Sequence, residues 1–331
     1  PILFRRFRIR AVAGSAPHYP WNHDFGAIAS KIGIPYVILM KECLITNQRH
    51  YDRIVNRYSK MEQDAIGHAV VYNRSAESAF LTLGIVTKDR ISVLGCIRMD
   101  RYLRKIRSGY VESCLKKKSR KQVVVFAFFH GVGLYGWVPA MPPTGGPGFF
   151  RLFSGLHEAI GTLALKRSDV DFVVKVKWPG PYPRDQILEC FERVGASIES
   201  MPNLSVTAEM DAQTLIFSSH VVVSFGSTTM LEAAIARKPV IVPHFAEAID
   251  EDYSGYIQLK DTYSVYDVAK SAEHLVELIE HRLENDRISG DTYRQRERYF
   301  EEYVSTLNGD ATDRYASKLR ELMSRSGKPL E

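Results

Sequence analysis

Short apolar runs alternate along the chain with segments that have the spacing of amphipathic helices. Residues 221–223 are all valine and residues 240–242 are Val-Ile-Val, as expected for strands that are buried on both faces. Between these runs, Leu231 and Ile235 are four residues apart and so share one face of a helix. Residues 221–243 therefore predict a strand, a tight turn, a helix and a second strand.

The same alternation extends over most of the sequence. The expected strands cover residues 8–13, 35–40, 69–72, 91–94, 122–129, 171–176 and 204–206. The expected helices cover residues 25–32, 51–61, 75–83, 152–165, 184–194, 211–218, 230–236, 265–284, 292–307 and 314–324. Strands that alternate with helices are typical of parallel α/β sheets. A length of 331 residues favours two domains. We expect a first domain at 1–110, a basic linker at 111–121, a second domain at 122–310 and a C-terminal helix and tail at 311–331.

Composition narrows the class of protein. Hydrophobic residues make up 45% of the chain and charged residues 25%, which is typical of a globular protein. No apolar run approaches the ~18 residues of a membrane span. The four cysteines, Cys43, Cys96, Cys114 and Cys190, form no C-x-x-C pair. This pattern fits a reducing cytoplasm and argues against a structural zinc site.

The formal net charge is +6, and basic residues cluster at 5–10 and 116–121. Such clusters are either solvated segments or contacts with anionic lipid at the inner face of a cell membrane, worth about 1 kcal/mol per residue. No nucleic-acid recognition motif accompanies them, so nucleic acid is not an expected partner.

The turn that follows residues 221–223 combines a glycine with hydroxyl groups at a helix start. Gly226 can adopt backbone angles that other residues avoid, and Ser227 or Thr228 can cap the helix. The first amides of a helix are unpaired and carry partial positive charge, so this turn predicts an anion site. Glu232 follows about one turn later, where it can accept hydrogen bonds from ribose hydroxyls. A capped helix without any ligand is the alternative. The expected nucleotide-binding residues here are Phe225, Gly226, Ser227, Thr228, Thr229 and Glu232.

Other polar residues follow neighbouring strands of the same predicted sheet. Ligands bind beyond the carboxyl ends of strands in open parallel sheets, and glycine amides, lysines and a helix start together can hold a diphosphate. Alternation along a strand places Lys175 and Lys177 on one side. The alternative is that they bind no ligand: a single histidine after a strand is more often hydrogen-bonded within the protein, and lysines at a strand end are more often solvated. The candidates are His130, Gly131, Gly133, Lys175 and Lys177.

The sequence from the G-S-T-T turn through Glu232 to K-P-V-I resembles the donor-nucleotide segment of GT-B glycosyltransferases. The likeness is to the type that acts in bacterial surface polysaccharide biosynthesis, and it covers residues 100–270 well and 20–100 loosely. Arg237-Lys238 stands where that superfamily often has glycine. Lys175-Val176-Lys177 resembles the K-x-H of relatives that transfer polyol phosphates, with lysine in place of histidine.

The resemblance implies an α/β fold of two Rossmann-like domains that face each other across a cleft. Two or three more βα units would precede Arg8 in a full domain of this type, so we expect the first domain to be short or truncated. The final helix is expected to cross back to the first domain.

The resemblance also assigns residues to the sugar, the acceptor and the general base. His244 and Glu247 are expected to face the sugar or its phosphate. The first domain is expected to supply the acceptor site and a base, which must lie within hydrogen-bond reach of the acceptor hydroxyl. The base candidates are Glu42, Asp24 and His23, and the acceptor-binding candidates are His18, Tyr19, Trp21 and Lys41. Asp24 has a second interpretation, as the cap of a helix that begins at Phe25.

The expected function is transfer of a sugar from a nucleotide-sugar donor to a hydroxyl of a lipid-linked or oligosaccharide acceptor. An acidic sugar such as Kdo lies within this class. We expect no metal and no cofactor, because lysines, amides and helix ends can neutralise the departing nucleotide. The expected location is the cytoplasm, at the inner face of the membrane. The alternatives are a CDP-polyol phosphotransferase, a UDP-GlcNAc 2-epimerase-like enzyme and a non-catalytic nucleotide-binding protein.

Overall fold

A computed structural model describes residues 6–7, 9–15, 20–40, 45–58, 66–128, 148–177 and 179–325. The chain forms two compact units. The first unit combines Pro1–Arg104 with Phe300–Glu331, and the second unit is Lys105–Tyr299. The expected boundaries differ from these, since residues 300–310 pack with the first unit and the expected linker at 111–121 contains a helix.

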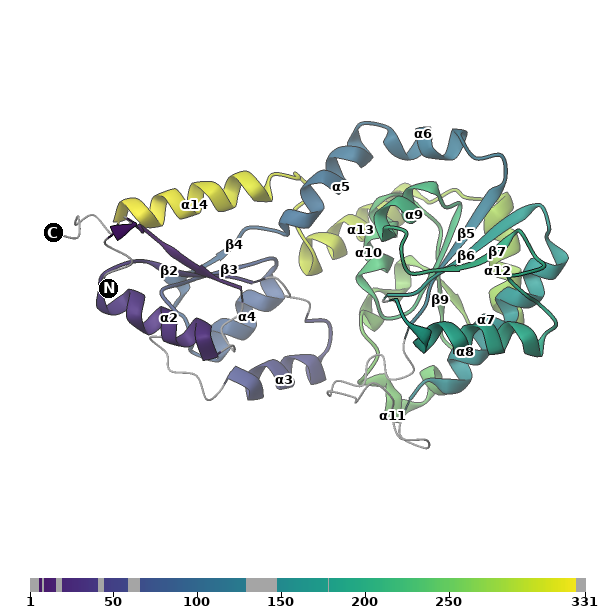
Figure 1. Ribbon diagram of the computed structural model, residues 1–331, viewed down its shortest axis with the longest axis horizontal. Helices are drawn as coiled ribbons and strands as arrows, with labels where there is room; N and C mark the ends of the chain where they lie inside the picture. The colour runs from purple at the N-terminus through teal and green to yellow at the C-terminus, as the bar shows by residue number, and fades with distance from the viewer. Residues whose placement is uncertain are drawn as a thin grey trace. The chain divides into compact units, whose positions relative to one another are not determined.

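The described part of the first unit is built on a four-stranded parallel sheet in the order β1-β2-β3-β4 (Figure 1). Its strands are β1 (Val12–Gly14), β2 (Tyr36–Leu39), β3 (His68–Val71) and β4 (Ile91–Val93). The helices that connect and follow them are α2 (Pro20–Lys31), α3 (Gln48–Tyr58), α4 (Arg74–Thr82) and α5 (Ile97–Arg107), and a 3-10 turn, η2 (Lys88–Arg90), precedes β4.

The two faces of this sheet are covered by different parts of the chain. Tyr36 and Ile38 of β2 pack into the core beneath α2 and α4. Val37 and Val70 point the other way and pack against Tyr315 of α14 (Ala311–Arg325). Side chains alternate between the faces of a strand, so the C-terminal helix closes the second face. The final helix therefore returns to the first unit, as the resemblance implied.

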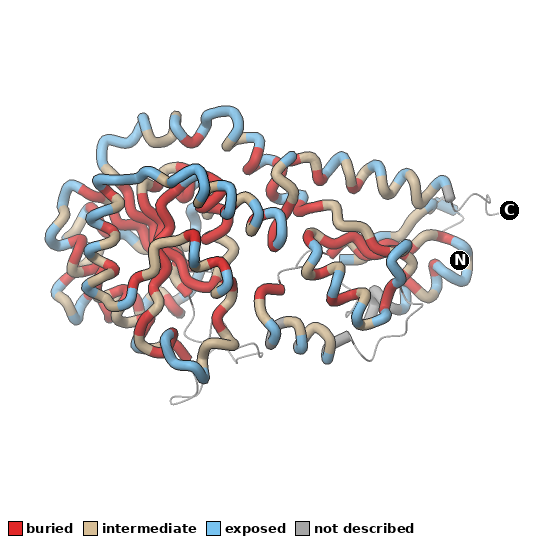
Figure 2. The backbone as a smooth tube through the Cα atoms, turned by 180° about the vertical axis from the view of Figure 1, so that it is seen from behind, coloured by how far each residue is buried: buried red, intermediate tan, exposed pale blue. Residues whose placement is uncertain are grey.

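The second unit has a six-stranded parallel sheet in the order β10-β9-β8-β5-β6-β7. Its strands are β5 (Lys121–Phe126), β6 (Val170–Lys175), β7 (Leu204–Thr207), β8 (Val221–Ser224), β9 (Val240–Pro243) and β10 (Asp267–Ala269). Numbered from β5, this order is 3-2-1-4-5-6 read from β7, which is the order of dinucleotide-binding Rossmann domains. The valine-rich strands are buried (Figure 2), which explains their uninterrupted apolar sequences.

Helices cover both faces of this sheet (Figure 1). On one face pack α7 (Phe150–Lys166), α8 (Pro181–Arg193) and α12 (Ala272–Glu284). On the other lie α9 (Ala212–Ser218) and α10 (Thr228–Ile235), with α6 (Tyr110–Lys116) against α9. The remaining elements are η3 (Ala246–Ile249), α11 (Glu251–Ser254), η4 (Lys260–Val265) and α13 (Gly290–Tyr303).

Two sequence-based expectations need correction. The helix expected at 265–284 begins only at Ala272, because Asp267–Ala269 pairs with β9 as an edge strand and Ser271 caps α12 through the His274 amide. The helix expected from Phe25 begins at Pro20, so Asp24 lies inside α2 and does not cap it.

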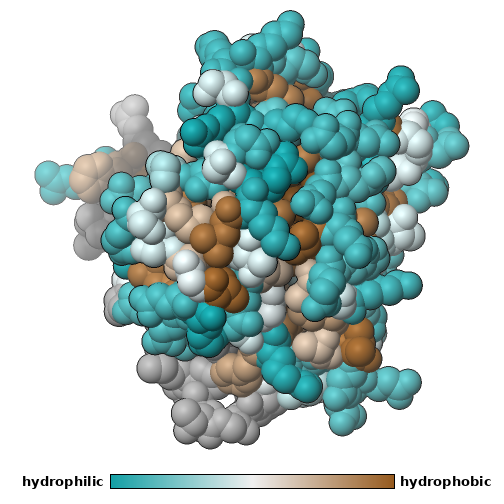
Figure 3. All heavy atoms as spheres, turned by 90° about the vertical axis from the view of Figure 1, so that its right-hand side faces the viewer, coloured by the Kyte–Doolittle hydropathy of each residue, from teal (hydrophilic) through white to brown (hydrophobic). Residues whose placement is uncertain are grey.

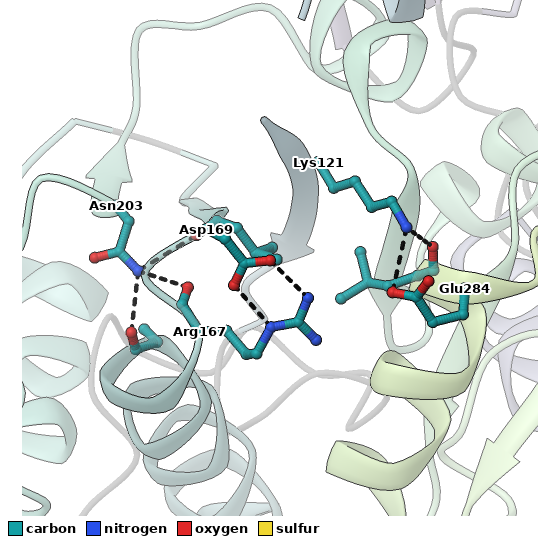
Figure 4. Close-up of polar contacts among 8 residues, drawn as sticks. Lys121, Arg167, Asp169, Asn203 and Glu284 are labelled. Carbon is teal, nitrogen blue, oxygen red and sulfur yellow. Dashed lines mark hydrogen bonds and ion pairs between the residues drawn. The ribbon is translucent and has the colours of Figure 1, made fainter. Parts of the chain in front are cut away.

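The amino-terminal edge of the second sheet is closed by polar contacts (Figure 4). The side-chain amide of Asn203 donates to the carbonyls of Ala164, Arg167 and Val170. Lys121 Nζ donates to the Leu283 carbonyl and lies 3.3 Å from the Glu284 carboxylate. Each of these polar groups is already paired, whereas ligands of open parallel sheets bind at the opposite, carboxyl edge.

On the face drawn in Figure 3, hydrophobic residues are scattered among hydrophilic ones. In the described part of the chain, no helix has both the length and the apolar character to cross a bilayer.

Candidate nucleotide site

The strand order places the Gly226 turn at the point where chain direction reverses within the second sheet. β5 and β8 are neighbours, yet the chain leaves β5 toward β6 on one side and leaves β8 toward β9 on the other. Loops that diverge in this way open a crevice at the carboxyl edge, which is where α/β proteins of this type bind ligands. The turn between β8 and α10 lies at this edge.

The turn itself is held by a short chain of hydroxyl hydrogen bonds. Gly226 has a φ of 57°, in the left-handed region that favours glycine. Ser227 is the N-cap of α10, and its hydroxyl accepts from the Thr229 amide at 3.3 Å. The Thr229 hydroxyl lies 3.0 Å from Ser227 Oγ and 2.8 Å from Ser224 Oγ. Ser227, one of the two predicted cap residues, therefore caps α10, and the Thr229 hydroxyl helps to hold the turn.

Thr228 differs from its two neighbours. It is the first residue of α10 and is half-buried, and its hydroxyl has no partner among the described residues. A hydroxyl beside the unpaired first amides of a helix is well placed to donate to a bound phosphate. Within the turn, Thr228 is thus the hydroxyl residue available to a ligand.

Glu232 lies further along α10 and is buried, with 6% of its surface exposed. The Gln213 side-chain amide donates to its carboxylate at 3.3 Å. Its expected contact with ribose stays a prediction.

Phe225 is part of the core. It is 1% exposed, and its ring packs against Phe128 and Phe149 with centroids 5.0 and 5.2 Å apart. Phe149 in turn packs against Tyr253. The side chain of Phe225 packs in the core next to the turn, so any ligand contact from this residue would come from its backbone.

The two candidate lysines have different surroundings. Lys175 ends β6, and its Nζ donates to the carbonyls of Val176 and Ala208 at 2.6 and 2.9 Å. Burial lowers the pKa of Lys175 below its usual value, and nearby Asp211 partly opposes this shift. Lys177 lies beyond the end of the strand and is exposed. Both lie at the carboxyl edge of the sheet, where the side chain of Lys175 is hydrogen-bonded to two backbone carbonyls.

His244 follows β9 and carries an unsatisfied buried atom. Its Nε2 is buried and has no hydrogen-bond partner among the described residues, while its ring meets Tyr263 edge-on at 5.4 Å. Burial lowers the pKa of His244, and Lys260 acts in the same direction, so both favour the neutral form of the ring. A buried polar atom without a partner usually signals a missing hydrogen-bonding group, such as a water or a ligand.

Glu247 is used by the fold. Its carboxylate accepts from the amides of Arg151 and Leu152 at 2.8 and 2.9 Å, which are the second and third residues of α7. Arg151 Nε also lies 3.2 Å from it. Burial alone would raise the pKa of Glu247, but these hydrogen bonds lower it overall. Glu247 thus caps α7 from η3, and its expected contact with sugar stays a prediction.

Replacing Glu247 with glutamine should lower the free energy of unfolding by about 1–2 kcal/mol, because one of two cap acceptors becomes a donor. Urea unfolding measures the change. Glu251→Gln is the matched control, since Glu251 is exposed and has no side-chain partner among the described residues. Unchanged stability combined with weaker binding of nucleotide-sugar would instead favour the sugar contact.

Several predicted residues cannot be placed. Those outside the described residues are His18, Tyr19, Lys41, Glu42, His130, Gly131 and Gly133. Trp21 and His23 belong to α2, and Asp24 is an exposed residue of the same helix. The assignment of the general base therefore stays a prediction.

Known structures share the architecture. No protein-family model and no curated protein sequence matches the chain. The UDP-GlcNAc 2-epimerase of Neisseria meningitidis bound to UDP-GlcNAc matches with a TM-score of 0.55 and 14% identity, over 96% of this chain and 78% of that one. Another UDP-N-acetylglucosamine 2-epimerase gives 0.56 and 16%, over 100% and 77%. The wall teichoic acid polymerase TagF gives 0.54 and 12%, over 89% and 70%.

These likenesses, together with the two parallel sheets, establish the class of fold: the chain is an α/β protein of GT-B type, with two Rossmann-like units.

Proposed function

We propose that this chain is an enzyme that binds a nucleotide-activated sugar at the Gly226 turn and transfers the sugar to an acceptor hydroxyl in the synthesis of a bacterial surface carbohydrate. The observation that carries the proposal is the position of the turn. A left-handed glycine, a capped helix start and the free hydroxyl of Thr228 coincide with the switch point of a 3-2-1-4-5-6 sheet. Lys175 and His244, at the ends of β6 and β9, supply further polar groups at this edge.

The structural neighbours support the nucleotide part of the proposal. One of them was solved with UDP-GlcNAc and another with UDP. In this chain, the pyrophosphate would lie against the first amides of α10, where the helix dipole favours negative charge. The nucleotide-sugar is a substrate, and the proposal includes no metal or separate cofactor.

A thermal-shift and calorimetric panel of UDP, GDP, CMP, CDP and dTDP tests the site. A nucleotide present at about 100 times its Kd should add about 2.7 kcal/mol of stability. Thr228→Val should weaken binding by about tenfold with an unchanged Tm of the free protein, because it removes one charge-assisted hydrogen bond. Thr229→Val is the matched variant, and should lower the Tm because it breaks the hydroxyl contacts inside the turn. Full nucleotide binding by Thr228→Val would place the site elsewhere.

Epimerisation is a second candidate activity, because several of the similar structures are UDP-GlcNAc 2-epimerases. Incubation with UDP-GlcNAc in the absence of any acceptor separates the two candidates. An epimerase would exchange solvent hydrogen into the sugar, whereas a transferase would need an acceptor for turnover. CDP-glycerol and CMP-linked sugars in the same assay test the polyol-phosphate and acidic-sugar alternatives.

A further inference from the structure

The first unit contains a cavity of about 920 Å³, and among its described lining residues there is no sequence-based candidate. It lies at the carboxyl edge of the unit's own sheet, beside the segments that follow β2 and β3 and the end of β4. The remaining wall comes from the end of α13, from Thr306 and from Arg314 in the first turn of α14. The lining residues that the structure describes all belong to this one unit.

Two hydroxyl groups in the wall of this cavity lack partners. Thr46 is only 7% exposed, and its Oγ1 has no hydrogen-bond partner among the described residues. Thr306 is far from Thr46 in the sequence, and its Oγ1 is likewise buried and has no hydrogen-bond partner among the described residues. Leaving a buried hydroxyl unpaired is unfavourable, so two of them on residues that line one cavity are candidates to pair with a bound group.

Two arginines and the start of a helix line the same cavity. The cavity includes Arg74 and Ser75, the first two residues of α4, and the first amides of a helix lack intrahelical acceptors. Asn73 caps the helix through the amide of Ala76, one residue further along. Arg74 lines the cavity and is exposed, and its side chain has no partner among the described residues. Arg314 lines the wall opposite, with one nitrogen 3.2 Å from the Val93 carbonyl.

The rest of the wall is suited to hydroxyl groups. Tyr51 and Tyr72 offer aromatic surface, and Gln48 offers an amide. Glu301 and Glu302 also line the cavity and are exposed, so they balance the two arginines. A balanced lining disfavours a ligand with several negative charges, and favours one anionic group attached to a hydroxyl-rich body.

We propose that this cavity binds a sugar or polyol that carries one anionic group, with the phosphate or carboxylate against Arg74 and the start of α4 and accepting from the hydroxyl of Thr46. Oxyanions at helix starts and at arginine forks form short, strong hydrogen bonds. If the proposed transfer activity is right, the ligand is the acceptor; that role rests on the proposed function, whereas the binding does not.

Calorimetry on the full chain in a phosphate-free buffer tests the site, with glucose 6-phosphate, glucuronate, glucose and inorganic phosphate as probes. We expect glucose 6-phosphate or glucuronate to bind, and the preference between them identifies the anionic group. Glucose and inorganic phosphate should each bind at least about tenfold more weakly, because each lacks half of the contacts.

Three variants locate the binding. Arg74→Gln should weaken the charged probe by about tenfold or more. Thr46→Val should weaken it severalfold and yet raise the Tm of the free protein, because it removes an unpaired buried hydroxyl; a purely structural Thr46 would show a lower Tm. Arg101→Gln is the matched control, since Arg101 is an exposed arginine of the same unit that does not line the cavity.

Equal affinity for glucose and glucose 6-phosphate, unchanged binding by Arg74→Gln, or no saturable binding of any probe would each overturn the proposal. UDP titrated into the same samples separates this result from the proposed function. Binding of UDP without binding of the probes rejects the cavity alone, and the reverse result rejects the nucleotide site alone.

Discussion

Replacing Asp100 with alanine should lower the free energy of unfolding by about 3 kcal/mol, because three hydrogen bonds to one buried carboxylate are lost. Asp100 lies on α5 and is 2% exposed. Its oxygens accept from the amides of Ala311 and Thr312 at 3.0 and 2.7 Å, and from the Thr312 hydroxyl at 2.6 Å. These amides begin α14, so the carboxylate caps the helix that closes the second face of the first sheet.

Urea unfolding measures this loss of stability. Faster amide hydrogen exchange in residues 311–325 would show that the loss is located in α14. Asp313→Ala is the matched control, since Asp313 lies in the first turn of the same helix but is exposed, and its loss should cost less than about 1 kcal/mol. Because Thr306 and Arg314 flank this cap, Asp100→Ala should also abolish binding in the cavity. Equal unfolding midpoints for Asp100→Ala and Asp313→Ala would show that α14 is held by its apolar contacts alone.

The second sheet could be predicted from sequence because its signals are local. The valine runs of β5 and β8 are apolar on both faces, and the Gly226 turn has its glycine and its cap within three residues. By contrast, β10 has only three residues, one of them Asp267, and its strand geometry depends on pairing with β9. Such an edge strand has too little sequence pattern to be separated from the helix that follows.

The cavity of the first unit could not be predicted for a related reason. Thr46 and Arg74 are brought to Thr306 and Arg314 only by the return of the chain from the second unit to the first. The local signal that was available is the cap at Asn73, which marks a helix start directly after β3. That signal marks where α4 begins but does not indicate that Arg74 lines a cavity.

The departure from the superfamily pattern at Arg237 has a structural explanation. Arg237 has a φ of 60°, and the amides of Arg237 and Lys238 donate to the carbonyls of Ala234 and Ala233. This is the Schellman geometry at the end of α10, which favours glycine. The Arg237 guanidinium stacks 3.8 Å from the ring centre of Tyr293, and a cation–π contact of about 0.5–1 kcal/mol offsets much of the backbone strain.

The neighbouring Lys238 is a buried cation without a carboxylate partner among the described residues. It is 3% exposed, and its Nζ donates to the carbonyls of Phe217 and Ser219 at 3.0 and 2.7 Å. Burial lowers the pKa of Lys238 to about 8, although Cys114, Glu112 and Asp286 act in the opposite direction. The folded protein therefore holds this proton less tightly than the unfolded chain, in which a lysine has a pKa of about 10.4.

The stability of the protein should consequently rise with pH between about 8 and 10.4, because the unfolded state binds more protons in this range. Below that window the buried charge opposes folding, and its neutralisation should add about 2–3 kcal/mol by pH 10. Lys238→Met should lack this increase. The unfolding free energy of the wild type minus that of the variant should therefore rise by the same amount from pH 7 to pH 10. Lys270→Met, which removes an exposed lysine, should keep the wild-type slope. Parallel pH profiles for wild type and Lys238→Met would mean that the ammonium is solvated in the folded protein, because only a desolvated charge produces the shift.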